Sequence, residues 1–405
     1  MPKPIAIIGT LDTKGQEVGY IRDLIQRLGC QAWVIDPGVL GQPAIAADCA
    51  REAVARAGGS DLDDLIAAGD KGRAIQTMID GTRAIVVQLY AEGKLGGVIA
   101  VGGGQGTAIG TTAMQALPIG VPKVMISTIA SGQNVFEPYV GTTDVTLMHS
   151  VADILGINTI TRKVFANAAA AVVAMVEASE SIEESDRTTL GATMLGLTTS
   201  CVLRAKELLD AQGYELVAFH PNGTGGRSME RLIDAGVIQG VMDISTQELT
   251  GHVCHGLFDA GPDRLTAAGR HGIPQVVAPG GTDYVVLGPL SSLTGEQRSR
   301  ALIIHNPNMT LVRTAKDEMA EIGRLIAGRL NAACGPTSVL IPMGGFSYSD
   351  RPGHAFYDPE ADAALIEALE TELAPQVQFF KVDAHINDPA FAEAVAGKMR
   401  ELMER

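Results

Sequence analysis

The residues best suited to chemistry form a glycine-rich stretch in the first half of the chain. Residues 97–112 read GVIAVGGGQGTAIGTT, an apolar run followed by a glycine cluster and then by small residues. This order predicts a buried strand that ends in a tight turn and opens a helix. The first N–H groups of a helix lack partners and carry partial positive charge, and glycine lets a phosphate approach the backbone. The stretch therefore indicates a site for a phosphorylated or nucleotide-like ligand, although a structural glycine turn has the same pattern.

Other loops that follow predicted strands contribute to the same candidate site. In an open parallel sheet, ligands bind beyond the carboxyl ends of the strands. The loops 9–15, 36–38, 102–107 and 127–132 carry hydroxyls, glycines, one lysine and two aspartates, which suit a polyphosphate and a ribose. Asp12 and Asp144 could support Mg²⁺ together with phosphate oxygens, and Lys14 could neutralise a phosphate. A helix N-cap for Asp12 and a solvated side chain for Lys14 are equally open interpretations.

Familiar nucleotide-binding signatures are only partly matched. Gly104, Gly106 and Gly110 have the longer glycine spacing of some dinucleotide folds, and Asp36 ends the second predicted strand, where a ribose-binding acid would lie. The glycine loop, however, follows a later strand instead of the first. The chain therefore does not match the dinucleotide-binding fingerprint, whose glycines follow the first strand. The sequence has no Gly-x4-Gly-Lys-Ser/Thr motif, which argues against a Walker-type NTPase.

The second half has its own candidate loops. HPNGTGGR, residues 220–227, follows a predicted strand and precedes a predicted helix, and Arg227 could grip a carboxylate or phosphate bidentately. A tight turn is the structural alternative. The substrate-binding candidates are His220, Asn222, Gly223, Thr224, Gly225, Arg227, His252 and His255.

His252, Cys254 and His255 allow two further kinds of chemistry. Zinc needs three or four converging ligands, and GHVCHG lacks a partner motif, so zinc is the less favoured interpretation there. A Cys254/His255 nucleophile pair is disfavoured because adjacent side chains often point apart. Gly-x-Ser-x-Gly and His-Glu-x-x-His do not occur, which removes two hydrolase classes.

Composition narrows the class of protein. The 405 residues are 46% hydrophobic, 19% charged and 4% aromatic, which favours close-packed α/β layers. A net charge of −15 argues against nucleic-acid binding and against an anionic membrane surface. The five cysteines contain no CxxC pair and fit a reducing compartment. With no predicted leader or membrane span, we expect a cytoplasmic protein that binds a small molecule.

Strand and helix patterns alternate in two cycles. We predict strands at 5–8, 32–35, 98–101, 123–126, 190–195, 215–219, 237–244, 275–278, 338–341 and 377–382, with helices at 16–28, 73–92, 166–176, 201–212, 313–331 and 391–403. The acidic stretch 177–189 predicts a linker between a nucleotide-binding domain at 1–180 and a second domain at 188–405.

The predicted fold class is α/β, with two Rossmann-like domains of mostly parallel sheets in three α/β/α layers. Segments 9–29 and 195–213, and 121–133 and 273–283, match in layout, which leaves duplication open.

The motifs GTLDTKG, AVGGGQGT, MISTIASG, HPNGTGG and IPMGGFS occur in this order over essentially the whole chain. Together they resemble an uncharacterised family of bacterial and fungal proteins that also forms the N-terminal inhibitory, ATP-binding domain of the tomato mosaic virus resistance protein. The resemblance implies two Rossmann-like domains, ATP-type nucleotide binding in the first half and self-association as a homodimer. It places nucleotide contacts on Thr10, Asp12, Thr13, Lys14, Gly103, Gly104, Gly106, Thr107, Ser127, Ser131 and Gly132. It implies no catalytic activity.

Three functions follow as hypotheses. The first is a nucleotide-binding enzyme of small-molecule metabolism, with ATP and Mg²⁺ in the first domain and the active cleft between the domains. The second is a non-catalytic, nucleotide-responsive protein-binding module. The third is a metal-dependent hydrolase at His252–His255. Whether the protein is an enzyme at all stays open at this point.

Overall fold

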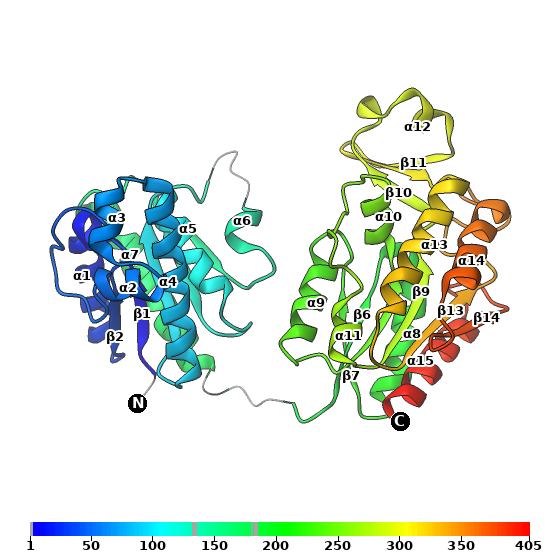
Figure 1. Cartoon of the computed structure of the whole chain (residues 1–405), viewed down its shortest axis with the longest axis horizontal. Coiled ribbons are helices and arrows are strands. Elements are labelled where there is room, and N and C mark those ends of the chain that lie inside the picture. Colours follow the sequence, from blue (N-terminus) through cyan, green and yellow to red (C-terminus); the bar gives the residue numbers. More distant parts are fainter. Residues whose placement is uncertain (1–2, 132–135, 180, 182–184) are drawn as a thin grey trace. The chain divides into compact units, whose positions relative to one another are not determined.

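A computed structural model describes residues 3–131, 136–179, 181 and 185–405. The chain forms two compact units, residues 1–184 and 185–405, and each is described by itself (Figure 1). Gly132, one of the predicted nucleotide contacts, lies outside the described residues.

The first unit is built on a five-stranded parallel sheet. Its strands lie in the order β2-β1-β3-β4-β5, and each hydrogen-bonded pair is parallel. The strands are β1 (Ile5–Ile8), β2 (Ala32–Ile35), β3 (Gly97–Gly102), β4 (Lys123–Ser127) and β5 (Thr146–His149). The first four have near-continuous apolar runs, as expected for strands covered on both faces.

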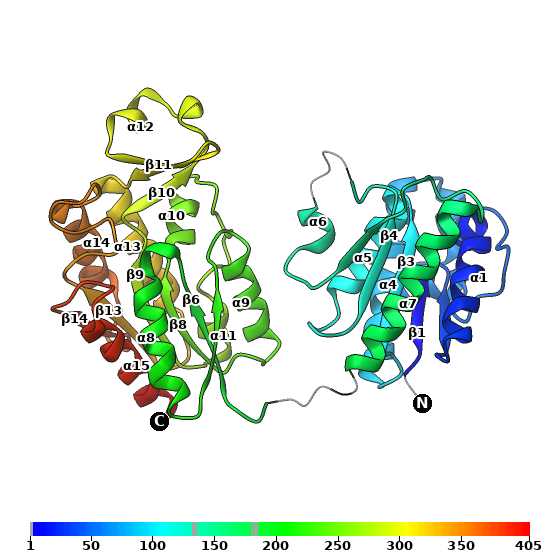
Figure 2. The ribbon, with the colours of Figure 1, turned by 180° about the vertical axis from the view of Figure 1, so that it is seen from behind.

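Helices cover both faces of this sheet, as Figures 1 and 2 show. One face carries α1 (Leu11–Arg27) and α7 (Thr159–Ser179), which share a core with the sheet. The other carries α2 (Arg51–Ala57), α3 (Leu62–Ala68), α4 (Lys71–Ala91) and α5 (Gly104–Gln115). A short α6 (Glu137–Val140) precedes β5. Helix α7 is long and apolar enough to cross a membrane by length and composition, but Phe165, Ala169 and Val172 on it are fully buried in this core.

The second unit repeats the arrangement with one more strand. Its parallel sheet has the order β14-β13-β9-β8-β6-β7. The strands are β6 (Thr189–Thr193), β7 (Glu215–Phe219), β8 (Gly240–Ser245), β9 (Gln275–Gly280), β13 (Thr337–Pro342) and β14 (Gln378–Val382). Helices α8 (Thr199–Asp210) and α15 (Pro389–Met403) pack on one face. The other face carries α9 (Gly225–Asp234), α10 (Gln247–Val253), α11 (Ala267–His271), α13 (Lys316–Asn331) and α14 (Pro359–Glu372).

A small antiparallel lobe interrupts the second unit between β9 and α13. It consists of β10 (Tyr284–Leu287), β11 (Leu302–Asn306) and β12 (Met309–Arg313), with the short α12 (Gly295–Ser299) at its tip, and is yellow in Figure 1. This lobe was not predicted from the sequence. The helix predicted over 313–331 was wrong at its start, because Arg313 ends β12 and α13 begins at Lys316.

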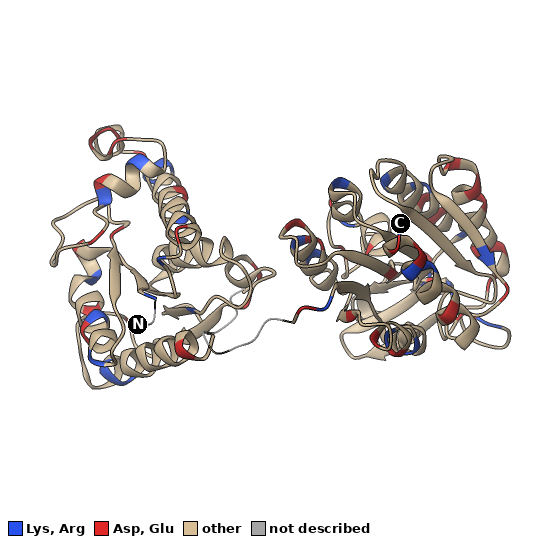
Figure 3. Ribbon diagram, turned by 90° about the horizontal axis from the view of Figure 1, so that it is seen from below, with Lys and Arg blue, Asp and Glu red and all other residues tan. Residues whose placement is uncertain are grey.

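The fold class predicted from the sequence is confirmed: both main sheets are parallel and lie between helical layers. The two units share one strand order, in which β1, β2, β3, β4 and β5 correspond to β6, β7, β8, β9 and β13. The matched segments 9–29 and 195–213 follow the corresponding strands β1 and β6. Acidic and basic residues are interspersed over the outer helices of each unit (Figure 3).

Candidate functional site

The strand order of the first unit creates a crevice at a defined place. From β1 the chain passes through α1 to β2 at one edge, and from β3 through α5 to β4 toward the other. The loops after β1 and β3 therefore diverge to opposite faces, which is the switch point where ligands bind in open parallel sheets. Thr10–Asp12 and Gly103–Gln105 stand on its two sides.

A pocket of about 400 Å³ lies at this edge. Its polar end is formed by Thr10, Asp12, Thr13 and Gln105, and Asp70 and Lys71 stand at the start of α4. Its walls are apolar and come from Val39, Leu40, Leu65, Ile66, Ala74, Ile75, Met78 and Ile109. The structure thus brings three predicted contact residues, Thr10, Asp12 and Thr13, together with an apolar wall that was not predicted.

The glycine cluster forms the start of α5, which is called the cradle below. Gly103 is the N-cap residue, and within the described chain no side chain caps this helix end. Gly104 and Gln105 are exposed, and Gln105 lines the pocket, so the first turn of α5 is open to solvent beside it. A Cβ on Gly104 would meet no described atom within 4 Å, whereas one on Gly102 would lie 2.7 Å from the Gly106 Cα. Gly102 therefore serves the turn, and Gly104 leaves the cradle open.

Two aspartates beside the cradle, Asp36 and Asp12, differ in their hydrogen-bond partners. Asp36 is 1% exposed, and its Oδ1 accepts from the N–H groups of Leu11 (3.0 Å) and Gly38 (2.9 Å). Burial raises the pKa of Asp36, and these two hydrogen bonds oppose the rise. Asp36 therefore holds the start of α1. The Oδ1 atom of Asp12, in contrast, is buried without a hydrogen-bond partner among the described residues.

Several predicted contact residues have structural partners instead of facing the pocket. The Lys14 ammonium donates to the carbonyl of Ile154. Thr107 and Ser127 are buried and share a hydrogen bond of 2.7 Å between their hydroxyls, which joins α5 to the end of β4. Ser131 contacts the His149 ring at 3.2 Å.

The Asp12–Asp144 pair considered for Mg²⁺ does not form. Asp144 pairs at 2.7 Å with the ammonium of Lys123, the first residue of β4. This contact lies at the amino edge of the sheet, whereas Asp12 lies at the carboxyl edge. Asp144 therefore cannot join Asp12 as a ligand of the same Mg²⁺ ion.

In the second unit, the glycine loop after β7 is occupied by the protein itself. Glu248 Oε1 accepts from the N–H groups of Gly223 (2.8 Å) and Gly226 (3.1 Å), and the Asn222 side chain accepts from Thr224 and Gly225 at 3.3 Å each. The N–H groups that suggested an anion site therefore already bind a carboxylate and an amide. Arg227 Nε donates to the Gly223 carbonyl at 2.7 Å.

Glu248 belongs to a buried charge network centred on Arg264. The Arg264 side chain is fully buried, contacts Glu248 at 2.6 Å and Glu230 at 3.3 Å, and makes two hydrogen bonds to Asp243. Glu230 also accepts from the N–H groups at the start of α11. Three acids around one arginine join α9, β8, α10 and α11, so this network is structural. Its residues are far apart in sequence, and no spacing in the chain indicates it.

The predicted residues His252 and Gly223 converge on Asp259. His252 Nδ1 lies 3.0 Å from Asp259 Oδ1, and the Gly261 N–H donates to the same oxygen at 2.7 Å. A Cβ on Gly223 would lie 3.1 Å from the Asp259 carbonyl, and one on Gly251 would lie 2.6 Å from Phe258. These close backbone contacts hold the His252–Asp259 pair in place near the carboxyl edge of the sheet. His220 contacts the Met194 carbonyl at 3.2 Å instead.

The neighbouring residues do not support the two alternatives considered for this segment. Burial, aided by Glu318, raises the pKa of Cys254 to about 12, which disfavours the nucleophilic thiolate. His255 has a positive φ of 53°. In the described part of the chain, no group of three or more His, Cys, Asp or Glu side chains is arranged to hold a metal ion.

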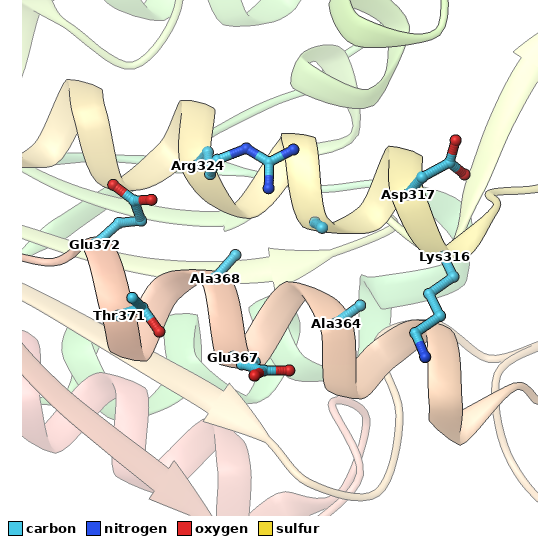
Figure 4. Close-up of a pocket in the computed structure, with 9 residues that line it drawn as sticks. Lys316, Asp317, Arg324, Ala364, Glu367, Ala368, Thr371 and Glu372 are labelled. Atoms are coloured by element: carbon cyan, nitrogen blue, oxygen red, sulfur yellow. The ribbon is translucent and has the colours of Figure 1, made fainter.

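A second hollow, of about 610 Å³, lies elsewhere. It is an open groove between α13 and α14, lined by Lys316, Asp317, Arg324, Ala364, Glu367, Ala368, Thr371 and Glu372 (Figure 4). A Cβ on Gly323 would lie 2.8 Å from Ala368, so these two helices pack closely beneath it. The groove contains none of the predicted site residues and is the outer seam of a helix pair.

Comparison with known sequences places the chain in a family. A UPF0261 protein of Clostridium tetani is 45% identical over 406 residues, which cover 100% of both chains. The ToMV resistance protein Tm-1(GCR237) of Solanum lycopersicum is 40% identical over 339 residues, which cover 82% of this chain and 45% of the tomato chain. Among solved structures, a UDP-N-acetylglucosamine 2-epimerase from Rickettsia bellii is 9% identical, with a TM-score of 0.24, over 100% of this chain and 96% of its own.

Family models match both units. The model of the uncharacterised protein family (UPF0261) N-terminal domain matches residues 3–181, and that of its C-terminal domain matches residues 187–403. The two matches together span nearly all of the chain, and the resemblance inferred from its motifs is confirmed. The chain therefore belongs to the UPF0261 family.

Proposed function

We propose that the first unit binds an ATP-type nucleotide, with its phosphates at the start of α5. The observation that supports this most directly is the exposed, uncapped helix start at Gly104, at the switch point of a parallel sheet. A phosphate there accepts from the free N–H groups and gains from the helix dipole. The adjoining apolar walls, with Leu65 and Met78, suit a flat base.

Asp12 supplies the position for a divalent cation. Its buried, unpartnered Oδ1 faces a desolvation cost that a cation would offset. Carboxylate and phosphate oxygens are the ligands that Mg²⁺ uses in nucleotide sites. Mg²⁺ would neutralise phosphate charge in a chain with a net charge of −15, and would add to the charge of Lys71, which lines this pocket.

Replacing Gly104 with valine tests this proposal. The new side chain enters open space, so the fold is kept while the cradle is filled. We expect the affinity for ATP with Mg²⁺, measured by titration calorimetry, to fall at least about tenfold, or about 1.4 kcal/mol. Gly295→Val is the matched control, because Gly295 also begins a helix and a Cβ there meets no described atom within 4 Å. Equal ATP affinities for both variants and the parent protein would contradict phosphate binding at the start of α5.

A second candidate function, acid–base catalysis in the second unit, is supported by the His252–Asp259 pair. With the ring proton on Nδ1, the carboxylate accepts from it and Nε2 keeps its lone pair, which is the arrangement of a general base. The side chains are 35% and 40% exposed, so a substrate can reach them. The competing proposal is a non-catalytic, nucleotide-responsive module.

The hydrolysis of a generic ester distinguishes the catalytic proposal from the non-catalytic one. We expect His252→Asn to lower the hydrolysis of p-nitrophenyl acetate several-fold, and Asp259→Asn to lower it less, because the imidazole is then only misoriented. His271→Asn is the matched control, since His271 also contacts an aspartate, Asp234, at 2.9 Å, but on the amino side of β9. An unchanged rate in His252→Asn, with bound ATP never converted to ADP, AMP or pyrophosphate, would favour the non-catalytic module.

A further inference from the structure

Three aspartates and one arginine meet at the carboxyl edge of the second sheet. Asp283 and Asp350 are 0% exposed, and Asp362 is 9% exposed. Arg313 Nη2 donates to Asp362 Oδ1 at 2.6 Å, and its Nη1 donates to the Asp283 carbonyl at 2.9 Å. The guanidinium therefore binds one carboxyl group directly, and its charge also acts on those of Asp283 and Asp350.

The hydrogen bonds leave two of the carboxyl groups half satisfied. Asp283 Oδ2 accepts from the Ser347 hydroxyl at 2.7 Å, and Asp350 Oδ2 accepts from the Phe346 N–H at 2.8 Å. The Oδ1 atoms of both are buried without a partner among the described residues. A carboxyl group that keeps a proton could donate to such an oxygen, which a carboxylate cannot do.

Other ionisable groups border the cluster. His385 Nε2 lies 2.9 Å from the Ser347 carbonyl, and its Nδ1 lies 3.1 Å from the Asn387 N atom. Tyr284 stacks on Phe356. Burial, followed by repulsion from Asp350, raises the pKa of Asp283 to about 7 and that of Asp362 to about 8, and burial raises the pKa of Asp350.

The cluster lies at the stem of the β10–β12 lobe. The lobe begins directly after Asp283 and ends at Arg313, where Tyr284 pairs with Arg313 in the antiparallel ladder. Arg313 then crosses to α14, where it contacts Asp362 and the Asp358 carbonyl at 3.1 Å. The charge of the cluster therefore acts on the joint between lobe and helix.

We propose that Asp283, Asp350 and Asp362 share one proton around Arg313, and that losing it loosens the lobe from α14. With the proton bound, one carboxyl group donates a hydrogen bond to its neighbour, and the cluster becomes less negative. Without it, three carboxylates repel one another in a medium of low dielectric constant. In the unfolded chain these groups titrate near the ordinary value for aspartate, about 3.9, so the folded state holds the proton more tightly. The stabilisation is therefore complete in acid and is lost as the pH rises through about 7 to 8.

Hydrogen exchange of the full chain tests this. After correction for the intrinsic exchange rate, we expect protection of the amides of Met309–Arg313 to fall about tenfold between about pH 6 and about pH 8.5. In Asp283→Asn the step disappears, because an amide keeps the Ser347 contact without carrying charge. Asp317→Asn, on an exposed aspartate of α13, should keep the step.

An infrared measurement gives a second, independent readout. The C=O band of a protonated carboxyl should be present at about pH 6, lost at about pH 8.5, and absent from Asp283→Asn at both. If Asp283→Asn does not fold, Asp350→Asn carries the same test. A protection that does not change with pH, or an unchanged step in a folded Asp→Asn variant of the cluster, would overturn the proposal.

Discussion

Replacing Arg264 with methionine should destabilise the second unit by about 3–5 kcal/mol, because it leaves buried acids without their cation. Arg264 is the shared partner of Glu230, Asp243 and Glu248, and its side chain is fully buried. Methionine replaces the volume but none of the hydrogen bonds. Lysine should restore little, since one ammonium cannot reproduce the two-pronged contact with Asp243.

Urea unfolding followed by circular dichroism measures this effect. Since the chain has two units, we expect the variant to move one transition and leave the other in place. Arg270→Met is the control, because Arg270 is 50% exposed and its contact with Asp234 is a surface ion pair, expected to contribute at most about 1 kcal/mol. Similar losses in the two variants would mean that the buried network adds nothing beyond an ordinary surface pair.

The sequence was most informative where a local pattern decides the structure. Apolar runs such as residues 5–8 and 98–101 identified buried parallel strands, and the turn residues after them identified where these strands end. The β10–β12 lobe was not predicted, because its strands are stabilised by pairing with each other. The helix predicted from Arg313 failed for the same reason.

The candidate site was predictable only in part, because a side chain's partners depend on the fold. Thr10, Asp12 and Thr13 line the pocket, whereas Lys14 is turned to the carbonyl of Ile154, 140 positions away. The glycine loop at 220–226 has the composition of an anion site, but Glu248 fills it after the chain folds. Composition identifies groups that can bind an anion, and only the structure shows whether the protein already provides one.

A single added methyl group should disturb the first unit strongly. A Cβ on Gly81 of α4 would lie 1.9 Å from the Val54 carbonyl oxygen, and one on Gly58 would lie 2.1 Å from that of Thr77. These two glycines let α2 and α4 cross in backbone contact. Gly81→Ala should therefore lower the free energy of unfolding of the first unit by about 2 kcal/mol, since overpacking exceeds the gain in helix propensity.

The effect should extend to the nucleotide pocket, because α4 also supplies its wall through Ala74, Ile75 and Met78. We expect Gly81→Ala to weaken ATP binding as well as stability, although it lies outside the pocket. Gly72→Ala on the same helix is the matched control: its Cβ would come no closer than 3.5 Å to Asp70, so it should raise stability by up to about 1 kcal/mol. If Gly81→Ala lowers the free energy of unfolding and Gly72→Ala raises it, the close crossing of α2 and α4 determines the result, and not the loss of a glycine. A neutral Gly81→Ala would mean that α2 and α4 can separate freely, and that the pocket wall does not depend on their contact.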